Sequence, residues 1–148
     1  SYGLTKYRNQ KVAIIFQAYN LLNYMTATQN VASALSMTKS KHTGDKEYIY
    51  STLNKLGIDR TLADKNVQQL SGGQQQRVAI ARALAVDAKI VIADEPTGNL
   101  DAGSAGTVAQ MLSKASQKHN QTIIMVTHDR QMADYADKII TIVDGVCQ

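Results

Sequence analysis

The chain has 148 residues and a mass of 16.1 kDa, the size of one domain or of part of one. Hydrophobic residues make up 44% and charged residues 19%, which is typical of a folded globular chain and not of a disordered one. No apolar run approaches the roughly 20 residues that cross a bilayer, and the first residues show no signal-peptide pattern, so we expect no secretion. The single Cys147 excludes an internal disulfide framework and a cysteine-based metal site.

The net charge is +4 and is unevenly distributed. Residues 1–60 hold eight Lys/Arg and three Asp/Glu, whereas residues 61–148 hold eight and nine. A pI of about 9.2 is compatible with a nucleic-acid partner. However, the basic residues are scattered, Trp is absent, and the seven Tyr are not interleaved with a basic run. We therefore interpret the charge as a solvated surface and expect no nucleic-acid partner.

Patterns in the first half predict one strand and two helices. Residues 11–16 (KVAIIF) form an apolar run typical of a buried strand. Residues 28–37 are predicted to form a short helix, and the polar residues 38–44 a loop. Residues 45–56 carry apolar side chains at helical spacing, and Gly57 stands where a C-terminal cap belongs. We therefore expect a second helix there.

The chain then alternates between helices and apolar runs. Ser71 and Gln74 have the spacing of a capping box, which predicts a helix that reaches about residue 86. Residues 89–94 (KIVIAD) form an apolar run that ends in an acid. Asp101 is placed to cap a helix that reaches about residue 118.

Three further elements are predicted towards the C-terminus. Residues 122–127 (TIIMVT) form a second apolar run, and residues 130–136 form a short helix. Residues 138–143 (KIITIV) form a third apolar run, which is closed by the turn signal Asp144-Gly145.

Apolar runs that alternate with helices indicate an α/β fold, with a parallel sheet covered by helices on both faces. In such sheets ligands collect beyond the carboxyl ends of the strands. Four polar side chains stand at or just after such ends, namely Gln17, Asp94, Glu95 and His128. The residues alone therefore predict a polar rim at one end of the sheet.

Two adjacent acids follow the 89–94 run. Asp94 could hold Mg²⁺, since this ion keeps several waters and needs few carboxylates. Glu95 could polarise an attacking water. Taken alone, the pair is equally explained as the start of a solvated loop.

A glycine-rich turn, Ser71-Gly72-Gly73, opens the helix after residue 70. Its glycines would let a phosphate approach the backbone, and the helix N-terminus offers free N–H groups. An ordinary capped helix start explains the same residues. Likewise, His128 could contact a γ-phosphate and Gln17 a metal or water, but singly each also fits a structural role.

Taken together, the motifs point to a known family. Three segments resemble, in order and spacing, motifs of the nucleotide-binding subunit of ABC transporters. The signature motif is resembled by LSGGQQQRVAIARAL, and the Walker B strand with its D-loop by IVIADEPTGNLD. The segment around the switch histidine is resembled by VTHD. The Q-loop entry of that subunit is resembled by Phe16-Gln17, followed by Asn20-Leu21-Leu22 and by residues 28–31. ADEPTGNLD is most similar to the branch that serves macrolide, lipoprotein and peptide exporters.

The resemblance implies a partial P-loop NTPase (RecA-like) core with parallel strands plus the ABC helical subdomain. It divides the chain into residues 1–17 (strand and Q-loop), residues 18–70 (helical subdomain) and residues 71–148 (signature helix, Walker B, D-loop and switch histidine). It also implies ATP and Mg²⁺ as cofactors, and ATP hydrolysis that powers export or other membrane-linked transport.

The resemblance also implies a role for each matched residue. Asp94 would hold Mg²⁺, Glu95 would be the general base, and His128 would stabilise the γ-phosphate. Gln17 would contact Mg²⁺, sense the γ-phosphate and couple to the membrane subunit. The residues expected to meet ATP on the opposite subunit or to bridge the two subunits are Ser71, Gly72, Gly73, Gln74 and Asp101.

The partners implied are a transmembrane permease subunit and a second nucleotide-binding subunit, in a homodimer. The protein would lie peripherally on the cytoplasmic face of the cell membrane. Two alternatives stay open. One is a soluble ABC-type ATPase of translation or DNA maintenance, although the long insertions or second motif set usual there are absent. The other is a non-enzymatic interaction fragment.

The phosphate-cradling pattern G-x-x-x-x-G-K-[ST] does not occur in the sequence. The family would place it before Ser1, so we expect a C-terminal portion of the domain that hydrolyses ATP negligibly alone. The absent segment would supply a central strand. We therefore also expect the free chain to self-associate, swap elements or lose order near residues 138–143.

Overall fold

The computed structural model describes residue 3, residues 11–119 and residues 121–147. Of residues 1–17, which the resemblance assigns to a strand and the Q-loop, residues 1–2 and 4–10 therefore lie outside the described residues. The elements in chain order are β1 (Val12–Ile15), α2 (Ala27–Met37), α3 (Lys46–Lys55), α4 (Arg60–Ala63), the 3-10 helix η1 (Val67–Gln69), α5 (Gly72–Ala85), β2 (Ile90–Asp94), α6 (Ala102–His119), β3 (Thr122–Val126), α7 (Arg130–Ala133), β4 (Ile142–Val143) and β5 (Val146–Cys147).

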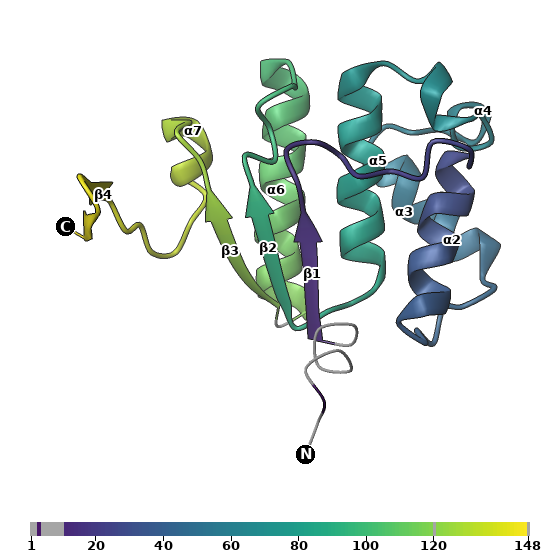
Figure 1. Ribbon diagram of the computed structural model, residues 1–148, viewed down its shortest axis with the longest axis horizontal. Coiled ribbons are helices and arrows are strands. Elements are labelled where there is room, and N and C mark those ends of the chain that lie inside the picture. The colour runs from purple at the N-terminus through teal and green to yellow at the C-terminus, as the bar shows by residue number, and fades with distance from the viewer. Residues whose placement is uncertain (1–2, 4–10, 120, 148) are drawn as a thin grey trace.

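Strands β1, β2 and β3 form a parallel sheet in that order. The register aligns Val12 with Ile90 and Ile90 with Thr122, so all three carboxyl ends lie at one edge (Figure 1). This confirms the α/β fold with parallel strands. It also brings the segments that follow the three strands to one rim.

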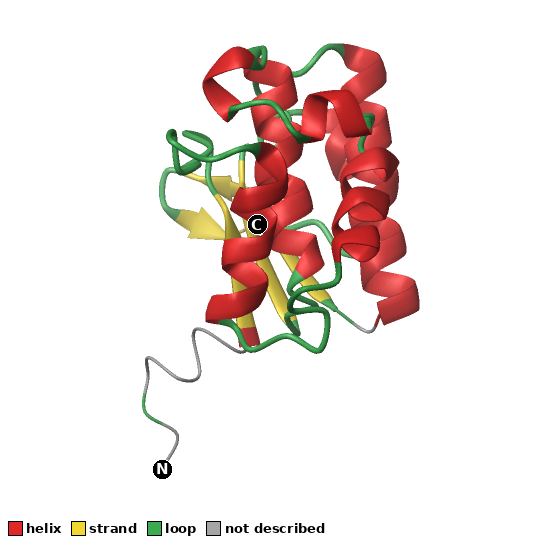
Figure 2. Cartoon of the chain, turned by 90° about the vertical axis from the view of Figure 1, so that its right-hand side faces the viewer, coloured by secondary structure: helices red, strands yellow, loops and turns green. Residues whose placement is uncertain are grey.

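One face of this sheet packs against helices. The side chains that alternate towards α5 and α6 are buried, among them Ile15, Val91 and Ala93. The opposite face carries Ile92 and Ile124, which are 36% and 52% exposed. Figure 2 shows the strands on one side of the molecule and the helices on the other. The prediction of helices on both faces is therefore wrong for the described residues, because both α5 and α6 pack on the same face.

The helices α2, α3 and α4 form a separate layer beside α5 (Figure 1). Their core contains fully buried aliphatic side chains, and α5 contacts α2, α3 and β1, so it belongs to both layers. Gly57 ends α3 as predicted. Its φ is 72°, and the amides of Gly57 and Ile58 donate to the carbonyls of Asn54 and Leu53, as in a Schellman motif.

Sequence patterns did not reveal α4 and η1, because each is only one turn long. Asp59 caps α4 by accepting from the amide of Leu62, and Asn66 caps η1 by accepting from the amide of Gln68. A single turn is too short for an apolar periodicity to develop.

The prediction for residues 138–143 as a strand of the parallel sheet is wrong. Only Ile142–Val143 are extended, and they pair antiparallel with Val146–Cys147. Their side chains are exposed. The turn between them, Asp144-Gly145, has φ of 49° and 79°, which confirms the turn prediction. The apolar run has β propensity, but within the described residues it pairs with no strand of the parallel sheet.

No helix in the described part of the chain has the length and apolarity needed to cross a membrane.

Candidate functional site

Glu95 follows β2 in a left-handed conformation, with φ of 44°. Such a φ is uncommon for a residue with a side chain. The Glu95 amide donates to the carbonyl of Val126 at 2.9 Å, so pairing with β3 continues one residue beyond the end of β2. The chain then turns, and the amide of Gly98 donates to the Glu95 carbonyl. The turn brings the Glu95 side chain to the segment that follows β3.

The Glu95 carboxylate binds the residues that follow β3. Its Oε1 lies 2.7 Å from the His128 Nδ1 and accepts from the His128 amide at 3.2 Å. Its Oε2 accepts from the Thr127 hydroxyl at 3.3 Å. The Glu95 side chain is 19% exposed, whereas that of His128 is 85% exposed. The ring therefore contacts Glu95 through one nitrogen and presents the remainder to solvent.

The hydrogen bond to the Glu95 carboxylate, reinforced by the negative charge of that group, raises the pKa of His128 above the ordinary histidine value. A raised pKa means that the pair stabilises the fold fully below the unfolded-state pKa of about 6.5. This contribution is lost as the pH rises through the pKa of the folded state.

We therefore expect a His128→Gln substitution to lower the melting temperature at about pH 6 and to have less effect at about pH 8.5. Thermal melts across this range check the expectation. Glu95→Gln should show the same pH dependence, since it removes the other partner. A melting-temperature difference that stayed constant with pH would contradict the pairing.

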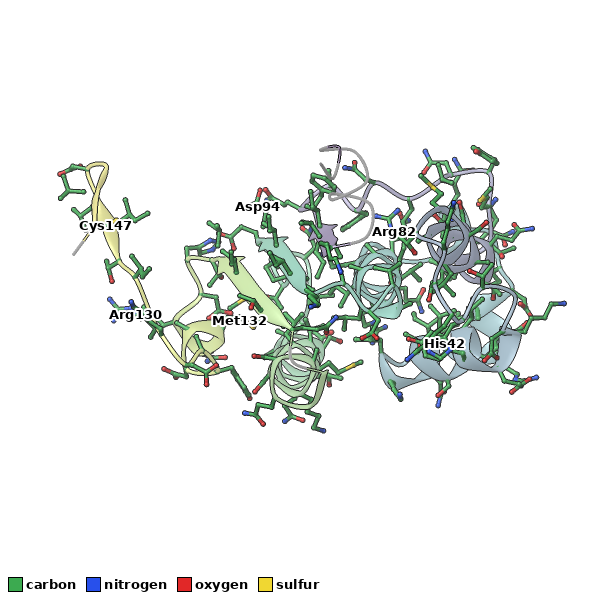
Figure 3. The ribbon with its side chains drawn as sticks, turned by 90° about the horizontal axis from the view of Figure 1, so that it is seen from below. His42, Arg82, Asp94, Arg130, Met132 and Cys147 are labelled. Atoms are coloured by element: carbon green, nitrogen blue, oxygen red, sulfur yellow. The ribbon has the colours of Figure 1, made fainter. Side chains whose placement is uncertain are left out.

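Asp94 ends β2 on the sheet face that carries no helix, and its side chain is exposed (Figure 3). Among the described residues it makes no ion pair. Gln17 is also exposed, two residues beyond the end of β1, the neighbouring strand. A free carboxylate and an amide oxygen at adjacent strand ends fit Mg²⁺, which needs few protein ligands. The described residues hold no group of three or more His, Cys, Asp or Glu that could bind a metal ion.

The glycine-rich turn Ser71-Gly72-Gly73, hereafter the signature turn, opens α5 with the predicted capping box. The Ser71 hydroxyl accepts from the Gln74 amide at 3.2 Å, and the Gln74 side chain accepts from the Ser71 amide at 2.9 Å. Ser71 remains exposed, so its hydroxyl faces outward even though one lone pair serves the helix. The turn is thereby held in one conformation.

The two glycines of this turn touch segments that follow different strands. A Cβ on Gly72 would lie 3.1 Å from the Tyr19 hydroxyl, in the segment after β1. A Cβ on Gly73 would lie 3.4 Å from a Leu100 methyl, in the segment after β2. The missing side chain at Gly72 therefore lets the turn lie close to the segment after β1, whereas a Cβ at Gly73 would make an ordinary contact with Leu100.

Asp101 precedes α6 and caps its first turn, as predicted. Its Oδ1 accepts from the Ser104 amide at 3.0 Å, and its carbonyl accepts from the Ala105 amide. Hydrogen bonds from the Ser104 hydroxyl and amide lower the pKa of Asp101 below its usual value. The carboxylate is exposed, so it remains available at the surface.

Comparisons with known proteins identify the family of this chain. The model of the family described as ABC transporter matches residues 3–98, which is more than half of the chain. This chain belongs to the ABC transporter family. The match includes the signature turn, Asp94 and Glu95, and ends before His128.

Curated relatives of this family cover nearly the whole chain. The uncharacterized ABC transporter ATP-binding protein YclH of Bacillus subtilis is 48% identical over 91% of this chain. The lipoprotein-releasing system ATP-binding protein LolD of Cytophaga hutchinsonii is 40% identical over 97%. The chain spans 60% of the length of the first and 65% of the second.

Solved structures of MJ0796, an ABC transporter cassette of Methanocaldococcus jannaschii, have the same fold. The dimeric structure matches with a TM-score of 0.88 at 37% identity, over 96% of this chain and 62% of that one. A second dimeric structure of MJ0796, in a post-hydrolysis state bound to ADP and Pi, matches equally well.

Two side chains that sequence analysis did not single out support the ABC signature motif and Glu95. The Gln76 amide, in α5, is buried and donates to the Pro96 carbonyl at 2.8 Å. The Thr127 hydroxyl accepts from the Asp129 amide and donates to Glu95. A hydroxyl just before a strand-end histidine is a signal for Thr127. No spacing in the sequence points to the partner of Gln76.

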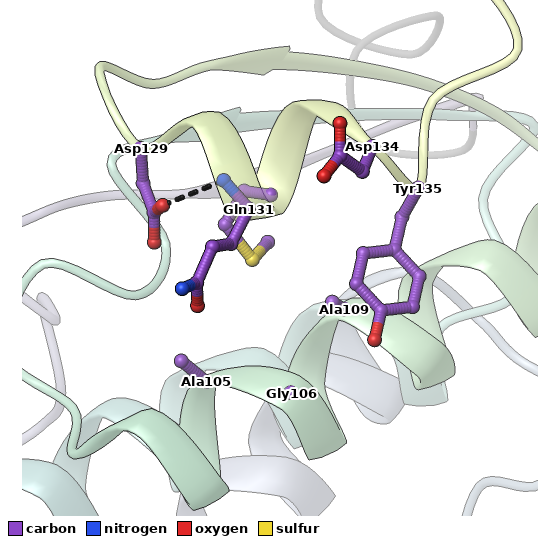
Figure 4. Close-up of a pocket in the computed structure, with 8 residues that line it drawn as sticks. Ala105, Gly106, Ala109, Asp129, Gln131, Asp134 and Tyr135 are labelled. Carbon is purple, nitrogen blue, oxygen red and sulfur yellow. Dashed lines mark hydrogen bonds between the residues drawn. The ribbon is translucent and has the colours of Figure 1, made fainter.

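Two surface hollows adjoin this region. One, of about 430 Å³, is lined by Glu95, Thr97, Gly98, Leu100, His128, Asp129 and Arg130, so it opens on the Glu95–His128 pair. The other, of about 360 Å³, lies between α6 and α7 (Figure 4). Small residues of α6 line one side of it, and Asp129 accepts there from the Gln131 amide. Glu95 and His128, the candidate catalytic residues, line the first hollow and not the second.

Proposed function

We propose that this chain is part of the ATP-binding subunit of an ABC exporter and supplies the groups that sense and cut the γ-phosphate of ATP. The observation that carries the proposal is the Glu95–His128 pair, joined at 2.7 Å beside the exposed Asp94. A carboxylate, a histidine and a free acid at the carboxyl rim of a parallel sheet suit phosphoryl transfer to water.

Glu95 is proposed as the general base. Its Oε2 has one contact, a hydrogen bond of 3.3 Å from Thr127, so it is the oxygen that is freer to accept a proton from water. The Thr127 hydroxyl and the two His128 contacts orient the carboxylate. The Glu95 φ and its backbone bond to Val126 fix where the side chain starts.

His128 is proposed to bind the γ-phosphate. Its Nδ1 contacts Glu95, so its Nε2 is left to donate to a phosphate oxygen. Because the pKa of His128 is raised, the ring holds its proton to a higher pH than an ordinary histidine, which favours donation to an anion. Asp94 and Gln17 would hold Mg²⁺, whose charge would offset that of the phosphate.

We propose the partners and the division of the chain on the same basis. Residues 1–17 and 71–148 would belong to the ATPase core and residues 18–70 to the helical subdomain. Ser71, Gly72, Gly73 and Gln74 would face ATP on a second subunit, and Asp101 would bridge the subunits. The dimeric relative supports this arrangement. A permease subunit would place the assembly at the cytoplasmic face of the membrane.

The test uses a longer chain in which a phosphate-loop segment of the family precedes Ser1. We expect Glu95→Gln to lower kcat for ATP hydrolysis by about 10²–10⁴-fold, because it removes the general base. The matched control is Glu47→Gln, which changes the other glutamate of the chain, an exposed residue paired with Arg60. Equal losses in the two variants, measured as phosphate release, would contradict the proposal.

The sequence leaves open a second candidate function, that of a non-enzymatic interaction module. In that case the isolated chain would bind a membrane subunit without ATP. Substitutions at exposed positions of residues 18–60 should then weaken binding, and nucleotide should have no effect on it.

A further inference from the structure

The guanidinium of Arg82 joins α5 to the segment that follows β1. Its Nη1 donates to the Asn20 carbonyl at 2.6 Å and its Nη2 to the Tyr19 carbonyl at 3.0 Å. In the sequence, Arg82 lies more than 60 residues from Asn20. Figure 3 shows Arg82 on α5, beside the chain that leaves β1. The side chain is half-buried, and burial lowers its pKa below the usual arginine value. One side chain therefore holds two consecutive carbonyls.

Those two carbonyls belong to residues with left-handed backbone. Tyr19 has a φ of 57°, which is uncommon for a residue with a bulky side chain, whereas the φ of 49° at Asn20 is one that asparagine tolerates. The local support is two backbone hydrogen bonds, from Tyr19 to the Phe16 carbonyl and from Asn20 to the Ala18 carbonyl. A charged, forked donor that fits both carbonyls at once offsets the strain at Tyr19.

The same segment also meets the start of α5. A Cβ on Gly72 would lie 3.1 Å from the Tyr19 hydroxyl, and Gly72 stands ten positions before Arg82 on the same helix. Tyr19 therefore touches α5 at two separated points, through its hydroxyl and through its carbonyl. Two separated contacts resist rotation of the segment against the helix, which a single contact would not.

We propose that Arg82 is a positioning residue that locks the Gln17–Asn20 segment onto α5, so that Gln17 and the Ser71-Gly72-Gly73 turn move as one rigid body. The functional meaning rests on the proposed roles of Gln17 and the turn in ATP binding, whereas the link itself rests on the contacts alone. Gln17 would contact one ATP, and the turn would contact the ATP of the other site. The link through Arg82 would therefore couple the two sites.

Amide hydrogen exchange of the 148-residue chain tests the link without nucleotide. In Arg82→Met we expect the amides of Tyr19 and Asn20 to exchange at least about tenfold faster, while those of β2 stay within about twofold. Arg82→Lys should give an intermediate rate, since an ammonium keeps the charge but lacks the fork.

The matched control is Arg77→Met. Arg77 lies on the same helix and is also half-buried, but it reaches Ser104 and not the segment after β1. It should leave exchange at Tyr19 and Asn20 unchanged.

Unchanged exchange at Tyr19 and Asn20 in Arg82→Met, or an equal rise in β2, would overturn the proposal. If Arg82→Met does not fold, Arg82→Lys decides by the same comparison. Failure of the longer chain to bind ATP would contradict the proposed function and leave this result standing.

Discussion

The purified 148-residue chain is expected to hydrolyse ATP at a rate at least about 10⁵-fold below that of a longer chain carrying a phosphate loop. The sequence contains Glu95 and His128 but lacks the loop that would hold the phosphates against them. Positioning supplies much of the rate of phosphoryl transfer, so a base without a positioned substrate achieves little.

The measurement is phosphate release from ATP and Mg²⁺ at several protein concentrations. The Glu95→Gln chain, prepared identically, measures any contaminating ATPase. A substantial rate that disappears in Glu95→Gln would contradict the expectation, because it would show that the chain binds and positions ATP unaided.

The second large effect concerns the sheet face that carries no helix. We expect the chain to self-associate at micromolar concentration, because Ile124 and Val126 are 52% and 58% exposed there, and β3 pairs on one side only within the described residues. Ile124→Lys should lower the average mass from light scattering towards 16.1 kDa, since it removes apolar area and adds charge to the contact.

The control for this prediction is Met37→Lys, at the end of α2. Met37 is 71% exposed, but it belongs to a helix and not to the sheet. It should leave the association unchanged. A chain that is already a compact monomer before substitution would contradict the prediction.

The rim could be predicted from sequence because its residues follow strands directly. Asp94, Glu95 and His128 each stand at the end of an apolar run, and parallel pairing then brings these ends to one edge. The caps at Ser71 and Asp101 were also predictable, since capping depends on residues three positions apart. Local spacing therefore carries most of the candidate site.

The contacts that orient the rim could not be predicted in the same way. The partner of Gln76 lies 20 residues away and that of Arg82 more than 60. Both acceptors are backbone carbonyls, which any residue supplies, so residue types give no signal. The fate of residues 138–143 was unpredictable for a related reason, because an apolar run specifies a strand but not the neighbour with which it pairs.

The loop between α2 and α3 is a suitable site for adding a tag to this protein. Figure 1 shows it at the end of α2 away from the strand ends that carry Asp94 and Glu95. Gly44, in this loop, has φ of 84°, and a Cβ there would meet no atom within 4 Å. Because a side chain at Gly44 itself would strain the backbone, a short affinity tag is better inserted beside it, where it would stay clear of the strand ends at the opposite end of the molecule.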